Sequence, residues 1–587
     1  MYKILNKIDS PKDLKKLSFE ELNLLADEIK LACLNRTSKV GGHIGSNLCV
    51  SELTIALHYV FDFLKDKLVF DVSHQCYPHK ILTGRKSGFI DDDKMKDVSG
   101  YLAPNESDYD LFHIGHTSTS ISLACGLAKA RDLDNQNYNV VAVIGDGSLS
   151  GGEAFEGLNN AGSINSNFIV IVNDNDMSIA ENQGALAKNL RELKNSKGTC
   201  KNNFFKSLGF DYLYIEEGNN VEVLINELSK IKNTNHPIAV HINTIKGNGY
   251  NFAMSEKEKW HFRQPFNIET GELKTTNSSY DYYKLTHDFL LNENKTNKDL
   301  VVVTAATPAL CGFTQDLRDA FAERFVDVAI AEEHAVAYVS ALAKAGKRPV
   351  FGVCSSFIQR TYDQLSQDLS LNNSPAVILV YKGGISAANA THLSVFDIPL
   401  TKSIPNLVCL SPTTPNEYIS MFKWALKQNE HPVVIRVPFN PIDKPINFDN
   451  VEQKTYFPAE YKMIKNGENI CILALGNIFN LGEKVCCYLE ENYGLKPTLI
   501  NPIYSNILDK NMLDKLSSNH SIFVTLEDGV VDGGFGESIS RHLAKRGKVV
   551  LNFGAEKEFT SNIPVATLKE KYGLTPEFIA NEIMKKI

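Results

Sequence analysis

The chain has 587 residues, 43% of them hydrophobic and 22% charged, which are ordinary proportions for a globular protein of about three to four domains. The formal net charge of -8 argues against a nucleic-acid-binding surface, and no apolar run approaches the roughly 18 residues that cross a bilayer. The N-terminal residues show no apolar signal-peptide core, and the 11 cysteines lack C-x-x-C spacing. We therefore expect a reduced, cytoplasmic protein.

Apolar, strand-like runs alternate with amphipathic stretches along the whole chain, which predicts consecutive parallel-sheet α/β domains. We expect three of them, at residues 1–270, 295–445 and 465–587. The polar, turn-rich stretches 267–298 and 443–466 are interpreted as linkers. In the first domain, strands are predicted at 67–72, 138–145, 167–173 and 237–243. In the second domain, they are predicted at 300–308, 326–332, 349–354, 376–381, 407–412 and 432–438, and the third domain opens with a strand at 469–476.

Three segments of the first domain combine histidine with glycine, serine or threonine. They contain His43, then His74 and His79, then His113 and His116. A single histidine is usually structural or solvated, and these spacings do not form an H-x-x-x-H zinc site. Three such segments together predict imidazoles that bind a carboxylate, carbonyl or phosphate and carry protons near neutral pH.

Two predicted strands each end in an oxygen-bearing side chain, Asp146 in Gly-Asp-Gly and Asn175 in Asn-Asp-Asn. A carboxylate beside a phosphate repels it unless a divalent cation lies between them. A dinucleotide-binding loop is disfavoured, because Ser150 replaces the third glycine, and the Walker A lysine is missing. The spacing matches the thiamine-diphosphate motif, in which Asp146, Asn175 and the backbone carbonyl of Met177 would hold Mg²⁺. The alternative is a strand-end turn whose aspartate caps the next helix.

A predicted strand of the second domain runs into Glu332, with Glu333 and His334 opening a helix. Thiamine chemistry needs one carboxyl group hydrogen-bonded to the pyrimidine ring of the cofactor, and Glu332 is the candidate. The alternative is a helix N-terminus that favours acids electrostatically.

Phe357 and Arg360 follow the next strand of that domain. An aromatic ring on a strand-end loop can stack on a flat heterocycle, and a guanidinium can fork onto a carboxylate or phosphate. A core phenylalanine and a surface arginine explain the two residues equally well.

Taken together, these segments resemble the 1-deoxy-D-xylulose-5-phosphate synthase family, thiamine-diphosphate enzymes of the transketolase superfamily. The resemblance covers essentially the whole chain. It implies a diphosphate- and Mg²⁺-binding domain, a pyrimidine-binding domain and a C-terminal transketolase-like domain, assembled as a homodimer. Its most specific segments are D-V-S-H-Q-C-Y-P-H-K-I-L-T-G-R, G-H-T-S-T-S-I-S, N-D-N-D-M-S-I-A-E-N, V-A-I-A-E-E-H-A-V and S-F-I-Q-R-T-Y-D-Q.

The resemblance also implies roles for individual residues. The metal set would be Asp146, Asn175 and Met177, and the activating acid would be Glu332. The residues lining the cofactor would be His74, Ser118, Thr119, Ser120, Gly145, Gly147, Ser148, Lys246 and Phe357. The residues facing the reacting carbons would be His43, His116, His261 and His392, and the substrate-binding residues would be Tyr77, Arg360 and Lys382.

The implied reaction is decarboxylation of pyruvate and transfer of the two-carbon unit to the aldehyde of D-glyceraldehyde 3-phosphate, a step towards isoprenoid and thiamine precursors. The acceptor side departs from the family pattern. Lys382 and Phe439 replace two arginines that help hold the acceptor's phosphate, the segment around Asn389 is one residue shorter and lacks its aspartate, and Cys354 replaces a tyrosine. The segment after Ser178 is also shorter. We therefore expect the pyruvate half-reaction to be retained and leave the aldehyde open.

Two alternatives remain. One is a transketolase that takes its two-carbon unit from a ketose. The other is a degenerate paralogue that only binds or regulates, against which the intact Asp146, Asn175 and Glu332 argue.

Overall fold

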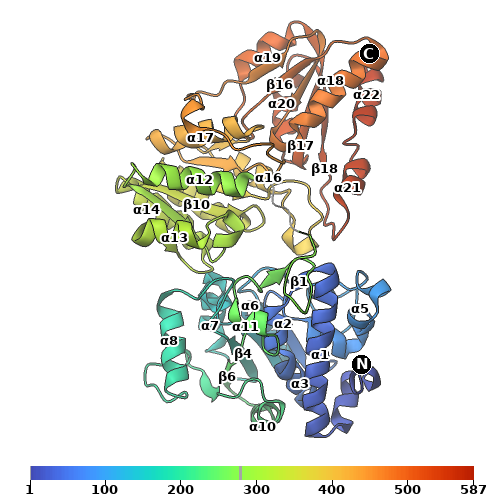
Figure 1. Ribbon diagram of the computed structural model, residues 1–587, viewed down its shortest axis with the longest axis vertical. Coiled ribbons are helices and arrows are strands. Elements are labelled where there is room, and N and C mark those ends of the chain that lie inside the picture. Colours follow the sequence, from blue (N-terminus) through green and yellow to red (C-terminus); the bar gives the residue numbers. More distant parts are fainter. Residues whose placement is uncertain (1, 276–279) are drawn as a thin grey trace. The chain divides into compact units, whose positions relative to one another are not determined.

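The computed structural model of the chain describes residues 2–275 and 280–587 (Figure 1). The chain divides into two compact units, Met1–Asn277 with Ala329–Ala331 and Ser278–Val328 with Glu332–Ile587. Among the described residues, one large sheet lies in the first unit and two lie in the second. The predicted fold class of consecutive parallel-sheet α/β domains is confirmed. None of the helices within these residues is long and apolar enough to span a bilayer.

The first unit is built on a parallel sheet of order β2-β3-β4-β6-β5. Alternate strand residues face opposite sides, so Val141 and Ile169 enter a core with α1, α3 and α10, whereas Val140 and Val170 enter a core with α6, α7 and α8. Burial of both faces explains the continuous apolar strands. The strands are β2 (Lys67–Phe70), β3 (Val140–Gly145), β4 (Phe168–Asp174), β5 (Asp211–Ile215) and β6 (Pro237–Asn243), and the helices are α1 (Phe19–Val40), α3 (Ser51–Val60), α6 (Ser120–Leu133), α7 (Gly152–Ala161), α8 (Gly184–Asn195) and α10 (Val221–Ile231).

The four strands predicted for this domain are confirmed. The sequence did not reveal β5, because it is an edge strand whose residues are mostly half-buried or exposed and so form no continuous apolar run. A short antiparallel pair, β1 (Gly42–His43) and β7 (Phe262–Arg263), adds a second, small sheet to the unit.

The second unit holds a six-stranded parallel sheet of order β12-β13-β11-β10-β8-β9 and a five-stranded sheet of order β14-β16-β15-β17-β18, in which only β14 is antiparallel. The first of these has strands β8 (Leu300–Thr304), β9 (Phe325–Asp327), β10 (Arg348–Cys354), β11 (Val377–Tyr381), β12 (Val408–Leu410) and β13 (Val433–Arg436), with α13 (Gln315–Phe321), α14 (Glu332–Lys344), α16 (Asp397–Lys402) and α17 (Pro415–Lys427). The second has β14 (Lys462–Lys465), β15 (Asn469–Ala474), β16 (Thr498–Asn501), β17 (His520–Val530) and β18 (Val549–Ala555), with α18 (Phe479–Tyr493), α19 (Lys510–Ser517), α20 (Phe535–Ala544), α21 (Val565–Lys571) and α22 (Pro576–Met584).

Three local predictions need correction. The stretch 443–466 is not simply a linker, because it contains strand β14 (Lys462–Lys465), which pairs with β16. The stretch 267–298 is not simply a linker, because it contains helix α12 (Tyr282–Asn294), whose Leu285 and Phe289 are fully buried in the core of the second unit. Residues 276–279 of that stretch lie outside the described residues. The strand predicted to reach Glu332 ends at Asp327, and Glu332 is instead the first residue of α14.

Candidate functional site

Asp146 and Asn175 lie together at the carboxyl ends of β3 and β4, which are hydrogen-bonded neighbours. The backbone N–H of Asn175 donates to Oδ2 of Asp146 at 3.2 Å, and that of Gly147 donates to Oδ1 at 3.0 Å. The Asn182 amide donates to the same Oδ2 at 2.8 Å. Asp146 and Asn175 are 4% and 6% exposed. Three donors therefore fix the carboxylate in a buried position.

The same place fits a divalent cation. Oδ1 of Asn175 is buried, yet it accepts no hydrogen bond within the part of the chain that the structure describes. Burial raises the pKa of Asp146 well above its usual value, and the nearby Asp174 carboxylate raises it further. A cation there would therefore lower the cost of burying the Asp146 negative charge. The described residues contain no cluster of three His, Cys, Asp or Glu side chains suited to a metal. The candidate donors are therefore one carboxylate, one amide oxygen and a backbone carbonyl, which are hard ligands of the kind that Mg²⁺ prefers.

Met177 lies two residues after Asn175 and forms an isolated antiparallel β-bridge with Glu181. Gly147 faces this segment closely, because a Cβ at Gly147 would lie 2.6 Å from Cβ of Ser178. A larger residue at 147 would therefore displace the turn that carries Met177. By contrast, a Cβ at Gly145 would meet nothing within 4 Å.

The loop containing Ser118, Thr119 and Ser120 is held by Asp71, at the end of β2. The carboxylate of Asp71 accepts from the backbone N–H of Ser118 at 2.8 Å and of Ser120 at 3.0 Å. The Ser118 hydroxyl donates to the carbonyl of Ser148 at 2.8 Å, and Ser118 has a φ of 74°. The predicted Ser118–Ser120 and Ser148 segments are thus brought together at the same sheet edge.

Three predicted histidines form a cluster in the first unit. The ring centroids of His43 and His74 are 5.0 Å apart, those of His43 and His261 are 5.4 Å apart, and those of His74 and His261 are 5.2 Å apart. Burial lowers the pKa of His43 and His261 well below the usual value, and each is lowered further by neighbouring cationic groups. Both imidazoles are therefore neutral near pH 7.

Lys246 joins this cluster, with Nζ 3.2 Å from Nδ1 of His261 and donating to the carbonyl of Ser178. Burial lowers its pKa to about 8. Tyr77 is 3% exposed and lies against Gly42, the residue before His43, because a Cβ on Gly42 would come within 2.6 Å of its hydroxyl oxygen. His116 is half-buried on the loop before α6.

His79 is not part of this cluster. Its Nδ1 is 2.9 Å from Nε2 of His58, and its Nε2 is 3.0 Å from Oδ1 of Asp110, whose carboxylate also receives both terminal nitrogens of Arg85. All four residues are buried. This histidine therefore belongs to a buried charged network, the structural alternative noted for single histidines.

In the second unit, Glu332 is 4% exposed, and its Oε2 is buried without a hydrogen-bond partner among residues 2–275 and 280–587. Burial raises its pKa to about 7, although the positive charge of Arg360 opposes the shift. A neutral carboxyl with a free oxygen fits a hydrogen bond to a heterocyclic nitrogen. Phe357 follows β10 and lies 5.9 Å from His392, centroid to centroid.

Three residues that depart from the family pattern, Lys382, Phe439 and Cys354, lie at strand ends of the same unit. Lys382 directly follows β11, is exposed and has a φ of 59°. Phe439 lies three residues after β13, which pairs with β11, and is 50% exposed. Cys354 is buried at the end of β10. Each replacement therefore sits at the carboxyl edge of the sheet, where parallel sheets form their sites.

The sequence reasoning missed three residues that support the first-unit site. Asp71 holds the Ser118 loop, Asn182 donates to Asp146, and Asp174 is hydrogen-bonded to Nε2 of His241 at 2.7 Å. Asp174 could have been found, because it directly follows a predicted strand just as Asp146 does, and Asp71 lies at the next-to-last position of the strand predicted at 67–72.

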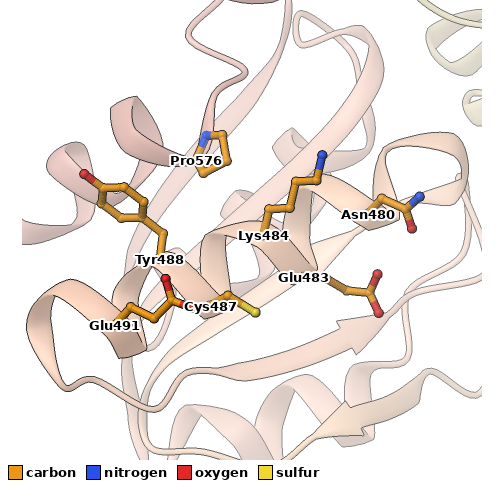
Figure 2. A pocket seen from close by; sticks show the side chains of 7 residues that line it. All are labelled: Asn480, Glu483, Lys484, Cys487, Tyr488, Glu491 and Pro576. Atoms are coloured by element: carbon orange, nitrogen blue, oxygen red, sulfur yellow. The ribbon is translucent and has the colours of Figure 1, made fainter.

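A separate, shallow groove of about 480 Å³ lies between α18 and α22 and is lined by Lys484, Cys487, Tyr488 and Pro576, among others (Figure 2). It contains none of the predicted site residues.

Comparisons with known proteins cover the whole chain. The family model for 1-deoxy-D-xylulose-5-phosphate synthase matches residues 5–203, that for the transketolase pyrimidine binding domain matches 278–440, and that for the transketolase C-terminal domain matches 459–579. Proteins named 1-deoxy-D-xylulose-5-phosphate synthase from Lachnoclostridium phytofermentans and Clostridium acetobutylicum are each 37% identical, over 100% of this chain and 99% and 100% of their own lengths. A solved transketolase from Leishmania mexicana is 15% identical with a TM-score of 0.43, over 96% of both chains. The chain belongs to the 1-deoxy-D-xylulose-5-phosphate synthase family, whose members are thiamine-diphosphate-dependent transferases that use a divalent metal such as Mg²⁺.

Proposed function

We propose that the chain synthesises 1-deoxy-D-xylulose 5-phosphate from pyruvate and D-glyceraldehyde 3-phosphate. Relatives that match over 99% and 100% of their own lengths carry the name of that activity. The observation that supports it best is the fixed Asp146 carboxylate beside the unpartnered Oδ1 of Asn175, because that pair is suited to a cation and not to a direct phosphate contact.

In the first unit, Asp146, Asn175 and the Met177 carbonyl would hold Mg²⁺. The cation would neutralise the diphosphate of the cofactor, with Gly145, Gly147 and Ser148 beside it. His74 and the loop containing Ser118, Thr119 and Ser120 would line the same cleft. When bound, thiamine diphosphate supplies the electron sink that a decarboxylation needs.

In the second unit, Glu332 would keep a proton at Oε2 and share it with a nitrogen of the pyrimidine ring. Its pKa of about 7 supports this role, because about half of the carboxyls still hold their proton at pH 7. Phe357 would stack on the ring, and His392 would face the substrate beside it.

The neutral imidazoles of His43 and His261 would donate hydrogen bonds to the carbonyl and carboxylate oxygens of pyruvate, together with His116. Lys246, still mostly charged at pH 7, would attract anionic groups. Tyr77, whose hydroxyl lies close to Gly42 next to His43, would help to bind the substrate. Arg360 would bind a carboxylate or phosphate.

A second candidate is a synthase with another aldehyde acceptor, which the exposed Phe439 favours. Two arginine forks would grip a phosphate bidentately, whereas Lys382 offers one point charge and Phe439 none. A third is a transketolase that uses a ketose donor. The homodimer and the cytoplasmic location remain predictions.

One experiment separates these functions. The purified protein, loaded with thiamine diphosphate and Mg²⁺, is given pyruvate and a panel of aldehydes, and CO₂ and products are measured. CO₂ release with deoxyxylulose phosphate formation supports the first proposal, and CO₂ release with another product supports the second. Turnover of ketose phosphates without pyruvate decarboxylation would favour a transketolase. Calorimetry that detects no cofactor binding would favour a degenerate paralogue.

A further inference from the structure

The third domain touches three of the segments of the second domain that depart from the family's acceptor pattern, those of Lys382, Asn389 and Phe439. Its Asn477 bonds both the turn after Lys382 and the segment of Phe439. Its Ser561 hydroxyl accepts from the Asn389 amide at 3.1 Å, and the N–H of Asn562 donates to the carbonyl of Ala388 at 2.9 Å. A domain without an assigned chemical role therefore borders these three segments.

Asn477 belongs to the short helix η12 (Gly476–Ile478), which is separated from β15 by one residue. Its Nδ2 lies 3.4 Å from the carbonyl of Gly383 and 3.1 Å from Oδ2 of Asp528. Its Oδ1 accepts from the N–H of Phe439 at 3.4 Å, and its backbone carbonyl accepts from the Asn440 amide at 3.3 Å. One amide side chain thus joins two strand ends that are far apart in sequence.

Asp528 is anchored by a buried guanidinium. Arg436, the last residue of β13, donates from Nη1 to Oδ1 of Asp528 at 2.8 Å and from Nε to Oδ2 of Asp397 at 2.7 Å. The three residues are 4%, 5% and 2% exposed, respectively. A charge cluster buried this well has a defined geometry, because any displacement leaves a charge unpaired.

The turn after Lys382 packs directly against both carboxylates. A Cβ at Gly383 would lie 2.7 Å from Oδ2 of Asp397, and a Cβ at Gly384 would lie 2.3 Å from Oδ2 of Asp528. Gly384 also has a φ of 124°, and Lys382 has a φ of 59°. The backbone that presents the Lys382 ammonium is therefore shaped against Asp528 and Asp397.

We propose that Asn477 and Asp528 are positioning residues of the third domain that set the Lys382 and Phe439 segments for the second substrate. This inference rests on the proposed function, because it assigns those two segments to the aldehyde acceptor. It predicts that disturbing the pair weakens the acceptor and leaves the handling of pyruvate intact.

The test compares Asn477→Ala and Asp528→Asn with the matched control Asn552→Ala. Asn552 is also a half-buried asparagine of the third domain, but among residues 2–275 and 280–587 its side chain bonds Thr525 and Ser540 of that domain. The KM and kcat are measured with pyruvate plus glyceraldehyde 3-phosphate and with pyruvate plus unphosphorylated glyceraldehyde. CO₂ release from pyruvate alone is measured separately.

We expect both test variants to raise the KM for glyceraldehyde 3-phosphate about tenfold, while the KM for pyruvate and CO₂ release without aldehyde stay within about twofold. Hydrogen exchange of the backbone amides at 382–384 and 437–440 should become faster in Asn477→Ala and not in Asn552→Ala. An unchanged aldehyde KM, or an equal loss of both substrates, overturns the inference. If the unaltered protein releases no CO₂ from pyruvate, it is the proposed function that fails.

Discussion

The backbone of Asn175 is hydrogen-bonded to the carboxylate of Asp146 at 3.2 Å, across two strand ends that are 29 residues apart in sequence. The bond holds the Asn175 side-chain oxygen and the Asp146 carboxylate together as one preformed set of metal ligands. Because the carboxylate is already fixed by Gly147 and Asn182 as well, little reorganisation is needed when a cation binds.

Removing the amide oxygen of Asn175 should therefore weaken the binding of the metal. We expect Asn175→Ala to lower the affinity for thiamine diphosphate with Mg²⁺ by at least about tenfold in calorimetry. Asn243→Ala is the matched control, because Asn243 ends β6 of the same sheet but its amide bonds the carbonyl of Glu216. Equal affinities of both variants and the unaltered protein would refute the assigned metal set.

Glu332→Gln should lower CO₂ release from pyruvate by about 100-fold or more while leaving cofactor binding nearly intact. The substitution keeps the shape of the side chain and removes the titratable proton. Glu333→Gln, one residue further along α14, is the control. Substantial residual turnover in Glu332→Gln would contradict the role of the acid.

The Glu332 carboxyl should also make the stability of the protein depend on pH. Because burial raises its pKa to about 7, the folded protein holds a proton that the unfolded chain releases near pH 4.5. Its contribution to stability is complete below that pH and is lost as the pH rises to about 7. The free energy of unfolding of Glu332→Gln, measured relative to that of the unaltered cofactor-free protein, should therefore increase by up to about 3 kcal/mol between pH 5 and pH 8. Denaturation at both pH values checks this, and a constant difference would show that Glu332 titrates normally.

The sequence predicts the fold well where burial covers both sheet faces, because such strands are long apolar runs. It fails at β5, an edge strand, and at α12, whose buried Leu285 and Phe289 lie among polar residues. Element ends are predicted less well: the strand before Glu332 stops at Asp327.

Among the candidate site residues, strand-end position and motif spacing were enough to predict that Asp146 and Asn175 meet. They could not predict that Tyr77 is buried against Gly42 or that Asn477 joins the segments of Lys382 and Phe439. Those contacts depend on side chains brought together by tertiary packing, and a single amide in a short helix has no distinctive sequence pattern.

Lys246 should make stability depend on pH in the alkaline range. Burial lowers its pKa to about 8, so the folded protein loses its proton well before the unfolded chain does at about 10.5. Stability should therefore rise with pH from about 8 to 10.5. In Lys246→Met this rise should disappear, whereas the surface control Lys259→Met should retain it. Urea denaturation across this range is the measurement, and a rise that persists in Lys246→Met would contradict the burial of the charge.

Asp110 should be important for stability. It is 3% exposed and accepts from both terminal nitrogens of Arg85 and from the N–H of Ala103. Asp110→Ala leaves the Arg85 charge buried without its main partner, which should cost about 3–5 kcal/mol of unfolding free energy. Asp514, whose carboxylate pairs with Arg546 and His542 at the surface, is the control, since Asp514→Ala should cost far less than Asp110→Ala. Similar losses in both variants would show that the buried network contributes little.

The identity of the acceptor can be tested by returning an arginine to position 439. Phe439 is 50% exposed next to the segment bonded by Asn477, so a guanidinium there has room to reach a phosphate. If the natural acceptor lacks a phosphate, Phe439→Arg should lower the KM for glyceraldehyde 3-phosphate about tenfold or more, as a new charged hydrogen bond of about 1.5–3 kcal/mol would. The KM for unphosphorylated glyceraldehyde should not change. Phe578→Arg, at a phenylalanine that is 48% exposed on α22, controls for added charge. Ordinary efficiency of the unaltered protein with glyceraldehyde 3-phosphate, without improvement in Phe439→Arg, would show that Lys382 and its neighbours already suffice for the phosphorylated aldehyde.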